Sequence, residues 1–317
     1  MILSVPLPLL LLIILFIISS IFYFSGFLYG TILLGTLLIC ISWGRLPIGI
    51  LLLPTKRKVT NTPDEVLFKP PPPIEECPIC FVTMPSHVRG KRYNGCCGKV
   101  ICGGCCAAVQ IRTKGFVFHC PFCRTRRPTS DEDMLKRERK RIDNHDDPLA
   151  IYNTASYYKQ GDYGFPMDHA KSLELYLRAG KLGYANAYYR AGIFYAFGGD
   201  GVEIDQKKTI HYWELAAMGG DSTARYSLGL VEKKAGNVER AIKHWMIAAE
   251  LGSLDSVNEV KKLGRKAKDD YAKSLRAYQK HLDDIRTDDR DNAAAFDNDY
   301  IYYGSAREIG PINPIYE

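Results

Sequence analysis

Residues 1 to 44 contain no lysine, arginine, aspartate, glutamate or histidine. An almost uninterrupted aliphatic and aromatic run from Leu9 to Phe24 resumes after a short break and continues to Trp43. About 20 apolar residues span a bilayer, so residues 1–53 are predicted to form one membrane span or a tight hairpin of two. The lack of a basic first region and of a small-residue cleavage site argues against a secretory signal peptide.

Other absences narrow the classes of function. The chain has no glycine-rich phosphate loop and no local motif of an activated nucleophile, so a classical hydrolase or oxidoreductase finds no support. The formal net charge is +7, but the basic residues gather in short clusters and form no broad stripe. We therefore expect no nucleic-acid partner.

Arg45 and the cluster Lys56–Lys58 follow the apolar segment directly. Because positive residues next to a span stay on the cytoplasmic side, everything after residue 45 is predicted to face the cytosol. Residues 54–76 are polar and end in Pro70–Pro73. This stretch is expected to be a Pro-rich linker, stiff at its end, that holds the next module away from the membrane.

Eight cysteines then occur as four pairs within a segment too short to bury a stabilising core of its own. Two cysteines separated by two residues can bind one zinc ion from a tight turn, and four thiolates complete one structural site. Four pairs can therefore hold two zinc ions. Metal-bound thiolates also imply a reducing compartment. In chain order, the pairs are Cys77 and Cys80, Cys96 and Cys97, Cys102 and Cys105, and Cys120 and Cys123.

The order of the pairs and the spacing of CCGKVICGGC resemble the all-cysteine subclass of the RING finger family, over residues 77–126. The resemblance implies a small α+β domain cross-braced by two zinc ions. The first and third pairs would hold site one, and the second and fourth pairs would hold site two. The adjacent cysteines of the second pair depart from the family, so His119, His87 or Cys106 could replace Cys96. Otherwise Cys106, like Cys40, is expected to be a small buried apolar residue.

RING fingers act mostly as ubiquitin ligases that bind a conjugating enzyme charged with ubiquitin and form no covalent intermediate. By this resemblance, Ile79 and Pro121 would contact the conjugating enzyme. Arg124 would hydrogen-bond both the conjugating enzyme and ubiquitin, because its fork of five donors can bridge two partners. The alternative is a non-catalytic zinc-binding membrane scaffold for protein–protein interaction.

The C-terminal half repeats. Ala179, Ala216 and Ala248 correspond at offsets of 37 and 32 residues, as do Tyr176, Trp213 and Trp245. A period near 35 residues with small residues at packing points indicates stacked helix pairs. The segments resemble Sel-one-like repeats, relatives of the tetratricopeptide family. Asp168 and Asp205 are predicted N-caps of the second helices of their pairs.

The chain is thus predicted to be multi-domain, with a membrane segment, a RING and an all-α solenoid that recruits a protein substrate or adaptor. Residues 127–147 are expected to contain a charged linker helix, and residues 148–286 the repeats with a C-terminal cap from Ser253. Residues 287–317 are expected to be a disordered tail. By analogy with membrane quality-control proteins that carry such repeats, the membrane could be that of the endoplasmic reticulum.

Overall fold

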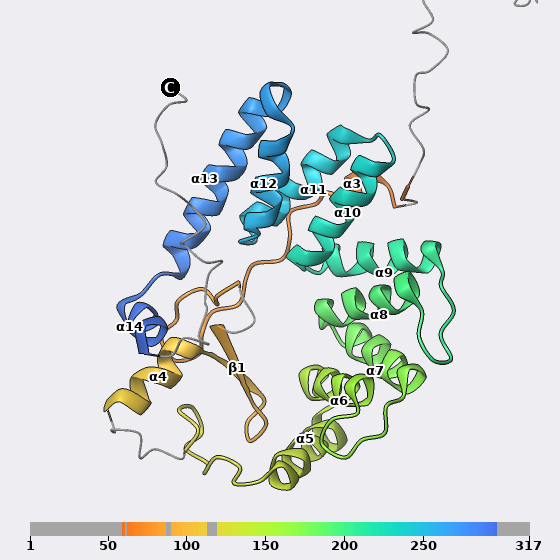
Figure 1. The fold of residues 1–317 in the computed structure, drawn as a ribbon. Coiled ribbons are helices and arrows are strands. Elements are labelled where there is room, and N and C mark those ends of the chain that lie inside the picture. The colour runs from red at the N-terminus through yellow and green to blue at the C-terminus, as the bar shows by residue number, and fades with distance from the viewer. Residues whose placement is uncertain (1–58, 61, 87–89, 113–118, 297–317) are drawn as a thin grey trace, which may run out of the picture. The chain divides into compact units, whose positions relative to one another are not determined.

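The computed structural model describes residues 59–60, 62–86, 90–112 and 119–296 (Figure 1). The predicted membrane segment, residues 1–53, lies outside these residues, as do Cys40 and His87. None of the described helices combines the length and the apolar character that a membrane crossing requires.

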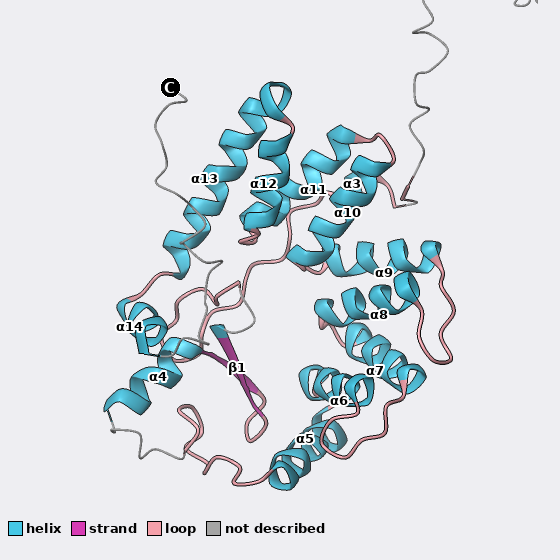
Figure 2. Ribbon diagram, viewed as in Figure 1, coloured by secondary structure: helices cyan, strands magenta, loops and turns pink. Residues whose placement is uncertain are grey.

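The described part of the chain is mainly helical, with a single two-stranded sheet (Figure 2). The elements that surround the sheet are α3 (Asp64–Leu67), β1 (Lys91–Asn94), β2 (Lys99–Cys102), α4 (Gly103–Arg112) and α5 (Asp131–His145). The helices that follow are α6 (Pro148–Gln160), α7 (His169–Lys181), α8 (Ala185–Phe197), α9 (Gln206–Met218), α10 (Ser222–Lys234), α11 (Val238–Glu250), α12 (Leu254–Lys262), the 3-10 helix η3 (Gly264–Ala267), α13 (Lys268–Ile285) and α14 (Asp288–Phe296).

The sheet is an antiparallel hairpin in which Lys91 pairs with Cys102 and Asn94 with Lys99. The amides of Cys97 and Gly98 donate to the carbonyl of Asn94 at 3.1 and 2.8 Å and close the turn. Gly98 has a φ of 69°, in the left-handed region that glycine adopts without a steric cost. Helix α4 starts at the residue after β2. Cys102 at the end of the strand and Cys105 in the first turn of the helix therefore lie close together.

Helix α5 covers the predicted charged helix, and its N-cap Ser130 accepts from the amide of Asp133 at 3.2 Å. The helix is mostly polar, but Glu138 is buried. Its carboxylate accepts from Asn153 Nδ2 at 2.9 Å and from the Tyr157 hydroxyl at 3.0 Å. Both partners lie on α6, so these bonds attach the linker helix to the first helix of the repeats.

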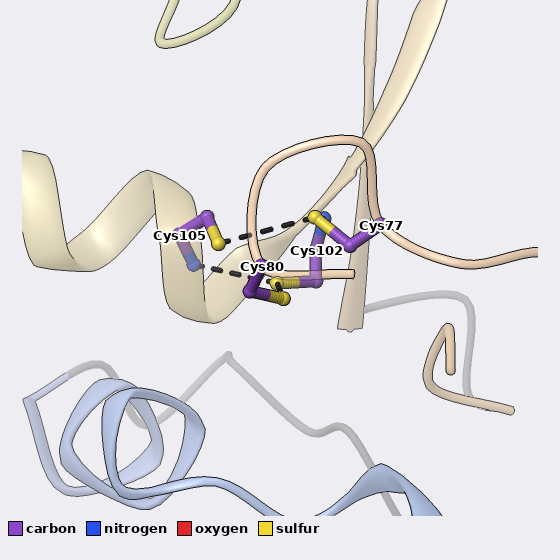
Figure 3. A group of neighbouring side chains, drawn as sticks. All are labelled: Cys77, Cys80, Cys102 and Cys105. Carbon is purple, nitrogen blue, oxygen red and sulfur yellow. Dashed lines mark hydrogen bonds between the residues drawn. The ribbon is translucent and has the colours of Figure 1, made fainter. Parts of the chain in front are cut away.

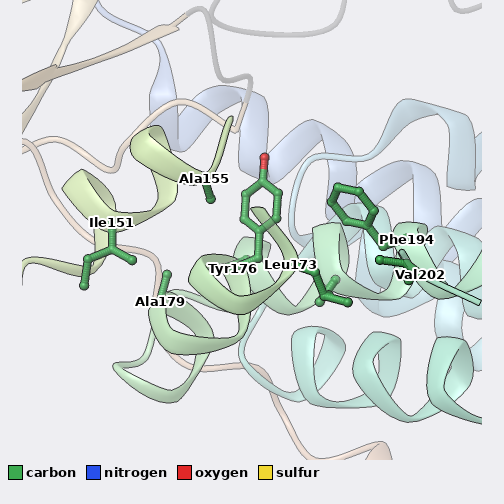
Figure 4. Packing of buried hydrophobic residues seen from close by; sticks show 9 residues of the cluster. Ile151, Ala155, Leu173, Tyr176, Ala179, Phe194 and Val202 are labelled. Carbon is green, nitrogen blue, oxygen red and sulfur yellow. The ribbon is translucent and has the colours of Figure 1, made fainter. Parts of the chain in front are cut away.

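Helices α6 to α11 form three antiparallel pairs. The positions predicted from the repeat are buried where the helices pack, as Figure 4 shows for Tyr176 and Ala179. Ala179, Ala216 and Ala248 are fully buried. The corresponding aromatic residues Tyr176, Trp213 and Trp245 are at most 9% exposed. The N-cap prediction is also confirmed, since the carboxylate of Asp168 accepts from the amide of Lys171 at 2.8 Å and that of Asp205 from Lys208 at 3.0 Å.

The prediction of a disordered tail from residue 287 is wrong for its first part. Helix α14 spans Asp288–Phe296 and starts with a hydrogen bond from the amide of Arg290 to the hydroxyl of Thr287. Its Ala293 is buried against Ala107 of α4 and Ile285 of α13. The segment is helical because it buries this small apolar face. Residues 297–317 lie outside the described residues.

Part of the predicted Pro-rich linker at residues 54–76 is structured. Residues 64–67 form α3, and Leu67 is fully buried. Its carbonyl accepts a hydrogen bond from Arg225 of α10 at 2.7 Å. The buried Leu67 side chain and this hydrogen bond dock this part of the linker on the repeats.

Candidate metal centres

Site one consists of Cys77, Cys80, Cys102 and Cys105, whose sulfur atoms all lie within 4.8 Å of one another (Figure 3). The Sγ atoms of Cys77 and Cys105 are 3.9 Å apart, as are those of Cys80 and Cys102. Four thiolates bound tetrahedrally to zinc at about 2.3 Å would be about 3.8 Å apart. The geometry of this cluster therefore fits a zinc ion.

Backbone amides point at the sulfur atoms of site one. The amide of Cys102 donates to Cys77 Sγ at 3.5 Å, and the amide of Cys105 donates to Cys102 Sγ at 3.4 Å. Such bonds favour the thiolate form that binds metal. The second bond arises because α4 begins directly after β2, so that the amide of Cys105, which is free in the first helical turn, faces the cluster.

Site two consists of Cys96, Cys97, Cys120 and Cys123, again with all sulfur atoms within 4.8 Å. Cys97 and Cys120 are 3.9 Å apart at their Sγ atoms, and Cys96 and Cys123 are 3.4 Å apart. The adjacent cysteines both reach this cluster from the turn of the hairpin. The structure thus brings together the two interleaved sets that the sequence predicts, and either set could hold a metal ion.

The residues considered as replacements for Cys96 do not join either cluster in the described part of the chain. His119 is exposed, and His87 lies outside the described residues. Cys106 is 3% exposed and packs in the apolar core of the module. Burial raises the pKa of the Cys106 thiol to about 11, which keeps it protonated at neutral pH.

Residues 77–126 are called the metal module. The C-x-x-C turns at its two ends have the same backbone structure. In each, the amide of the residue after the second cysteine donates to the carbonyl of the first cysteine: Phe81 to Cys77 at 2.9 Å, and Arg124 to Cys120 at 3.0 Å. Both Phe81 and Arg124 have positive φ, 57° and 60°. The backbone conformation of Arg124 is therefore the same as that of Phe81 in the first turn.

The surface of the metal module exposes large apolar side chains. Phe81 is 73% exposed, Phe122 42% and Ile111 44%. By contrast, Ile79 is partly buried against the core of the module. Sequence analysis identified Ile79 and Pro121 but missed the two phenylalanines, although each lies next to a predicted residue in a C-x-x-C turn.

Arg290 of α14 is a further residue that sequence analysis missed. It is fully buried and donates to the carbonyl of Thr83 at 2.8 Å and to that of Val82 at 3.4 Å. Its Nη2 also lies 3.9 Å from Cys80 Sγ. No local pattern could have identified this contact, because Arg290 and Thr83 are 207 positions apart in the sequence.

Four thiolates fill the tetrahedral shell of each predicted ion, so no position remains for water or a substrate. Zinc bound here would stabilise the fold and would take no part in a reaction. Whatever the metal module does chemically must therefore come from what its surface binds.

Comparisons with known proteins give two separate likenesses. A sequence profile of the Sel1 repeat matches residues 148–184, 185–221 and 224–253. Chitin synthase regulatory factor 4 of Schizosaccharomyces pombe is 29% identical over 103 residues, which are 32% of this chain and 16% of that protein. The E3 ubiquitin-protein ligase GW2 of Oryza sativa subsp. indica is 42% identical over 52 residues, which are 16% of this chain and 11% of that protein. The matched segments thus span less than a fifth of these relatives.

Two solved structures are similar at low sequence identity. A Sel1 repeat protein from Oxalobacter formigenes has a TM-score of 0.42 and 20% identity, and the likeness covers 61% of this chain and 72% of that one. The antigen c5321 of uropathogenic Escherichia coli has a TM-score of 0.40 and 19% identity, and covers 48% of this chain and 34% of that one. From the sequence profile and the three helix pairs together, residues 148–253 are three consecutive Sel1 repeats.

Proposed function

We propose that this chain is a membrane-anchored RING-type ubiquitin ligase. The metal module binds a ubiquitin-conjugating enzyme charged with ubiquitin, and the Sel1 repeats recruit the protein substrate or an adaptor. The observation that carries the proposal is the interleaving of the two cysteine clusters, in which the first pair meets the third and the second meets the fourth. The partial likeness to a rice E3 ubiquitin-protein ligase supports it.

Exposed apolar side chains next to the two C-x-x-C turns support a docking surface for the conjugating enzyme. Ile79 and Pro121 would contact that enzyme, with Phe81 and Phe122 as exposed neighbours. Burial of one such aromatic side chain contributes on the order of 1.5–3 kcal/mol. These residues supply affinity and no chemistry.

Arg124 is the residue that would act on the reaction. It is exposed, and no described residue accepts a hydrogen bond from its guanidinium. Its five donors are therefore available to carbonyls of the conjugating enzyme and of ubiquitin at once. Holding these two partners in one pose would favour attack of a substrate lysine amine on the thioester carbonyl, with the conjugating enzyme's cysteine thiolate as the leaving group.

The membrane anchor in this proposal rests on the sequence of residues 1–53. Their uncharged apolar run is long enough to cross a bilayer, and the basic residues after it favour a cytosolic position for the metal module and the repeats. A ligase tethered in this way would act on proteins at the cytosolic face of its membrane.

A non-catalytic scaffold is the second candidate. The saturated thiolate shells give the metal module no reactive metal position, and one partial relative is by its name a regulatory factor. In a scaffold, the two zinc ions would stabilise a docking module and no ubiquitin would be transferred.

Lysine discharge separates the two candidates. The full chain, purified in mild detergent, is added to a panel of ubiquitin-charged conjugating enzymes, and loss of the thioester to free lysine is timed. We expect acceleration by the wild type and by the control Arg139→Ala, an exposed arginine of α5, and a loss of at least about tenfold in Arg124→Ala. No acceleration by a chain that binds two zinc ions would overturn the ligase and leave the scaffold.

A further inference from the structure

Residues 62–68 of the linker lie against the repeats as a bound peptide would (Figure 1). These residues are named the cis segment. Their partners, named the docking surface, are Glu214 of α9, Arg225 of α10, and Arg240, Lys243 and His244 of α11. We infer that the docking surface is a peptide-binding site, held in cis by this segment and open to a partner peptide of the same chemistry when the segment leaves.

The docking surface contacts both backbone and side chains of the cis segment. Arg225, fully buried, donates to the carbonyl of Leu67 at 2.7 Å, and Leu67 itself is fully buried. The segment presents this carbonyl at the end of a single helical turn, closed by a bond from the amide of Phe68 to the carbonyl of Asp64 at 2.9 Å. A peptide with one helical turn and a buried leucine fits this arrangement.

The Phe68 ring lies close to the imidazole of His244 and to two cations, Arg240 and Lys243. Its ring centroid is 4.7 Å from that of His244. The Arg240 guanidinium and the Lys243 ammonium each lie 5.3 Å from the Phe68 centroid. Since a cation over an aromatic face is attracted by its quadrupole, this part of the surface selects an aromatic side chain.

An acidic residue four positions earlier completes the match. Arg240 forms an ion pair with Asp64, and Lys243 Nζ lies 3.8 Å from its other oxygen. At the other end, the Thr62 hydroxyl donates to Glu214 Oε2 at 2.7 Å. Arg240 and Lys243 therefore bind both an aspartate and an aromatic ring on one helical face. The two side chains have the spacing of the sequence Asp-x-x-Leu-Phe.

The docking surface holds more polar groups than the cis segment satisfies. Among the described residues, nothing hydrogen-bonds Arg225 Nε, Glu214 Oε1 or either ring nitrogen of His244, and all three side chains are at most 3% exposed. A permanent internal contact rarely leaves buried polar atoms without partners. The docking surface can therefore form more hydrogen bonds than the cis segment uses, and a partner peptide with the same motif and further polar groups would bind it more tightly.

Weak binding suffices for cis occupancy, because a tethered segment has an effective concentration on the order of millimolar. A recruited protein with the same motif would have to compete with it. This inference rests on the proposed recruiting role of the repeats and adds to it the chemistry of the partner and a means of control.

The test measures peptide binding to the full chain in detergent, with a labelled peptide of residues 59–72 as the probe. The released variant carries Asp64→Lys with Phe68→Ala, and we expect it to bind the probe at least about tenfold more tightly than the wild type does. A control peptide with the same two changes should not bind. Adding Lys243→Glu to the released variant should weaken probe binding, whereas Lys207→Glu, a matched exposed lysine on α9, should not.

Equal binding to wild type and released variant would overturn occupancy in cis. Absence of binding to a released variant whose thermal melt shows folded repeats would overturn the peptide site and make residues 62–68 a fixed part of the fold. Neither result bears on lysine discharge, which does not use the docking surface. Conversely, failure of discharge leaves the binding result intact.

Discussion

The hydroxyl of Tyr93 donates to the carboxylate of Asp147 at 3.0 Å and joins the hairpin of the metal module to the start of the repeats. The same carboxylate accepts from Arg141 Nε at 3.0 Å and caps α6 through the amides of Leu149 and Ala150. The buried Asp147 thus connects strand β1, helix α5 and helix α6 through hydrogen bonds.

Replacing Tyr93 by phenylalanine should lower the free energy of unfolding by about 1 kcal/mol, the usual net worth of one hydrogen bond. Burial raises the pKa of the Tyr93 hydroxyl, so it remains a donor at any working pH. Urea unfolding followed by circular dichroism measures the change. Tyr212→Phe, whose ring stacks on Tyr195, is the matched control and should change little. Equal losses in both variants would show that the hydroxyl bond contributes nothing particular.

Arg290→Ala should destabilise the metal module, because the carbonyls of Val82 and Thr83, just after the first C-x-x-C turn, lose a buried charged donor. Hydrogen bonds to charged groups contribute about 1.5–3 kcal/mol each. We expect zinc transfer to a chelator to become at least about tenfold faster, measured with a colorimetric zinc dye. The exposed Arg276→Ala on α13 should leave the rate unchanged. An unchanged rate in Arg290→Ala would mean that α14 does not support site one.

Serine replacements separate ligand from non-ligand cysteines. Cys80→Ser should reduce the zinc content from two ions to one, since it removes a thiolate from site one. Cys106→Ser should keep both ions, because this thiol packs in the apolar core. Native mass spectrometry counts the ions. Loss of an ion from Cys106→Ser would require a different set of ligands.

The stability of the repeats should fall with acidification through His244. Burial first, and then the charges of Arg225 and Arg240, hold its pKa well below 6.5 in the folded chain. The unfolded chain takes up a proton as the pH falls below about 6.5, and the folded chain does not, so stability present above that pH is lost.

His244→Phe removes this titration. Between pH 7.5 and 5.5, the wild type should lose about 1 kcal/mol more than the variant does, measured by urea unfolding at both pH values. Zinc loss at acid pH occurs in both chains and cancels in the comparison. Identical pH dependence in the two chains would show that His244 titrates normally.

The repeats and the two cysteine clusters were predictable because their signals are local and periodic. Ala179, Ala216 and Ala248 recur at nearly constant spacing, and each is buried where the period predicts. The cysteine pairs have spacings typical of metal ligands. For such elements, the residues that determine the local structure lie within a few positions of one another in the sequence or recur at a regular interval.

Arg290 and Leu67 could not be predicted in this way. Each lies in a polar segment whose composition favours a tail or a linker, and each is buried by partners more than 150 positions away. A single leucine or arginine carries no period. Their structure follows from tertiary contacts, and tertiary contacts override local preference.

The contact between Arg290 and Thr83 also sets an order of events during synthesis. At about 5–20 residues per second, a ribosome needs roughly 10–40 s to extend the chain from Thr83 to Arg290, 207 positions later. During that interval the carbonyls of Val82 and Thr83, just after the first C-x-x-C turn, lack the arginine that later donates to them. Any metal ion that site one takes up during that interval is bound without Arg290, and a chain that terminates before α14 would lack these two hydrogen bonds for its lifetime.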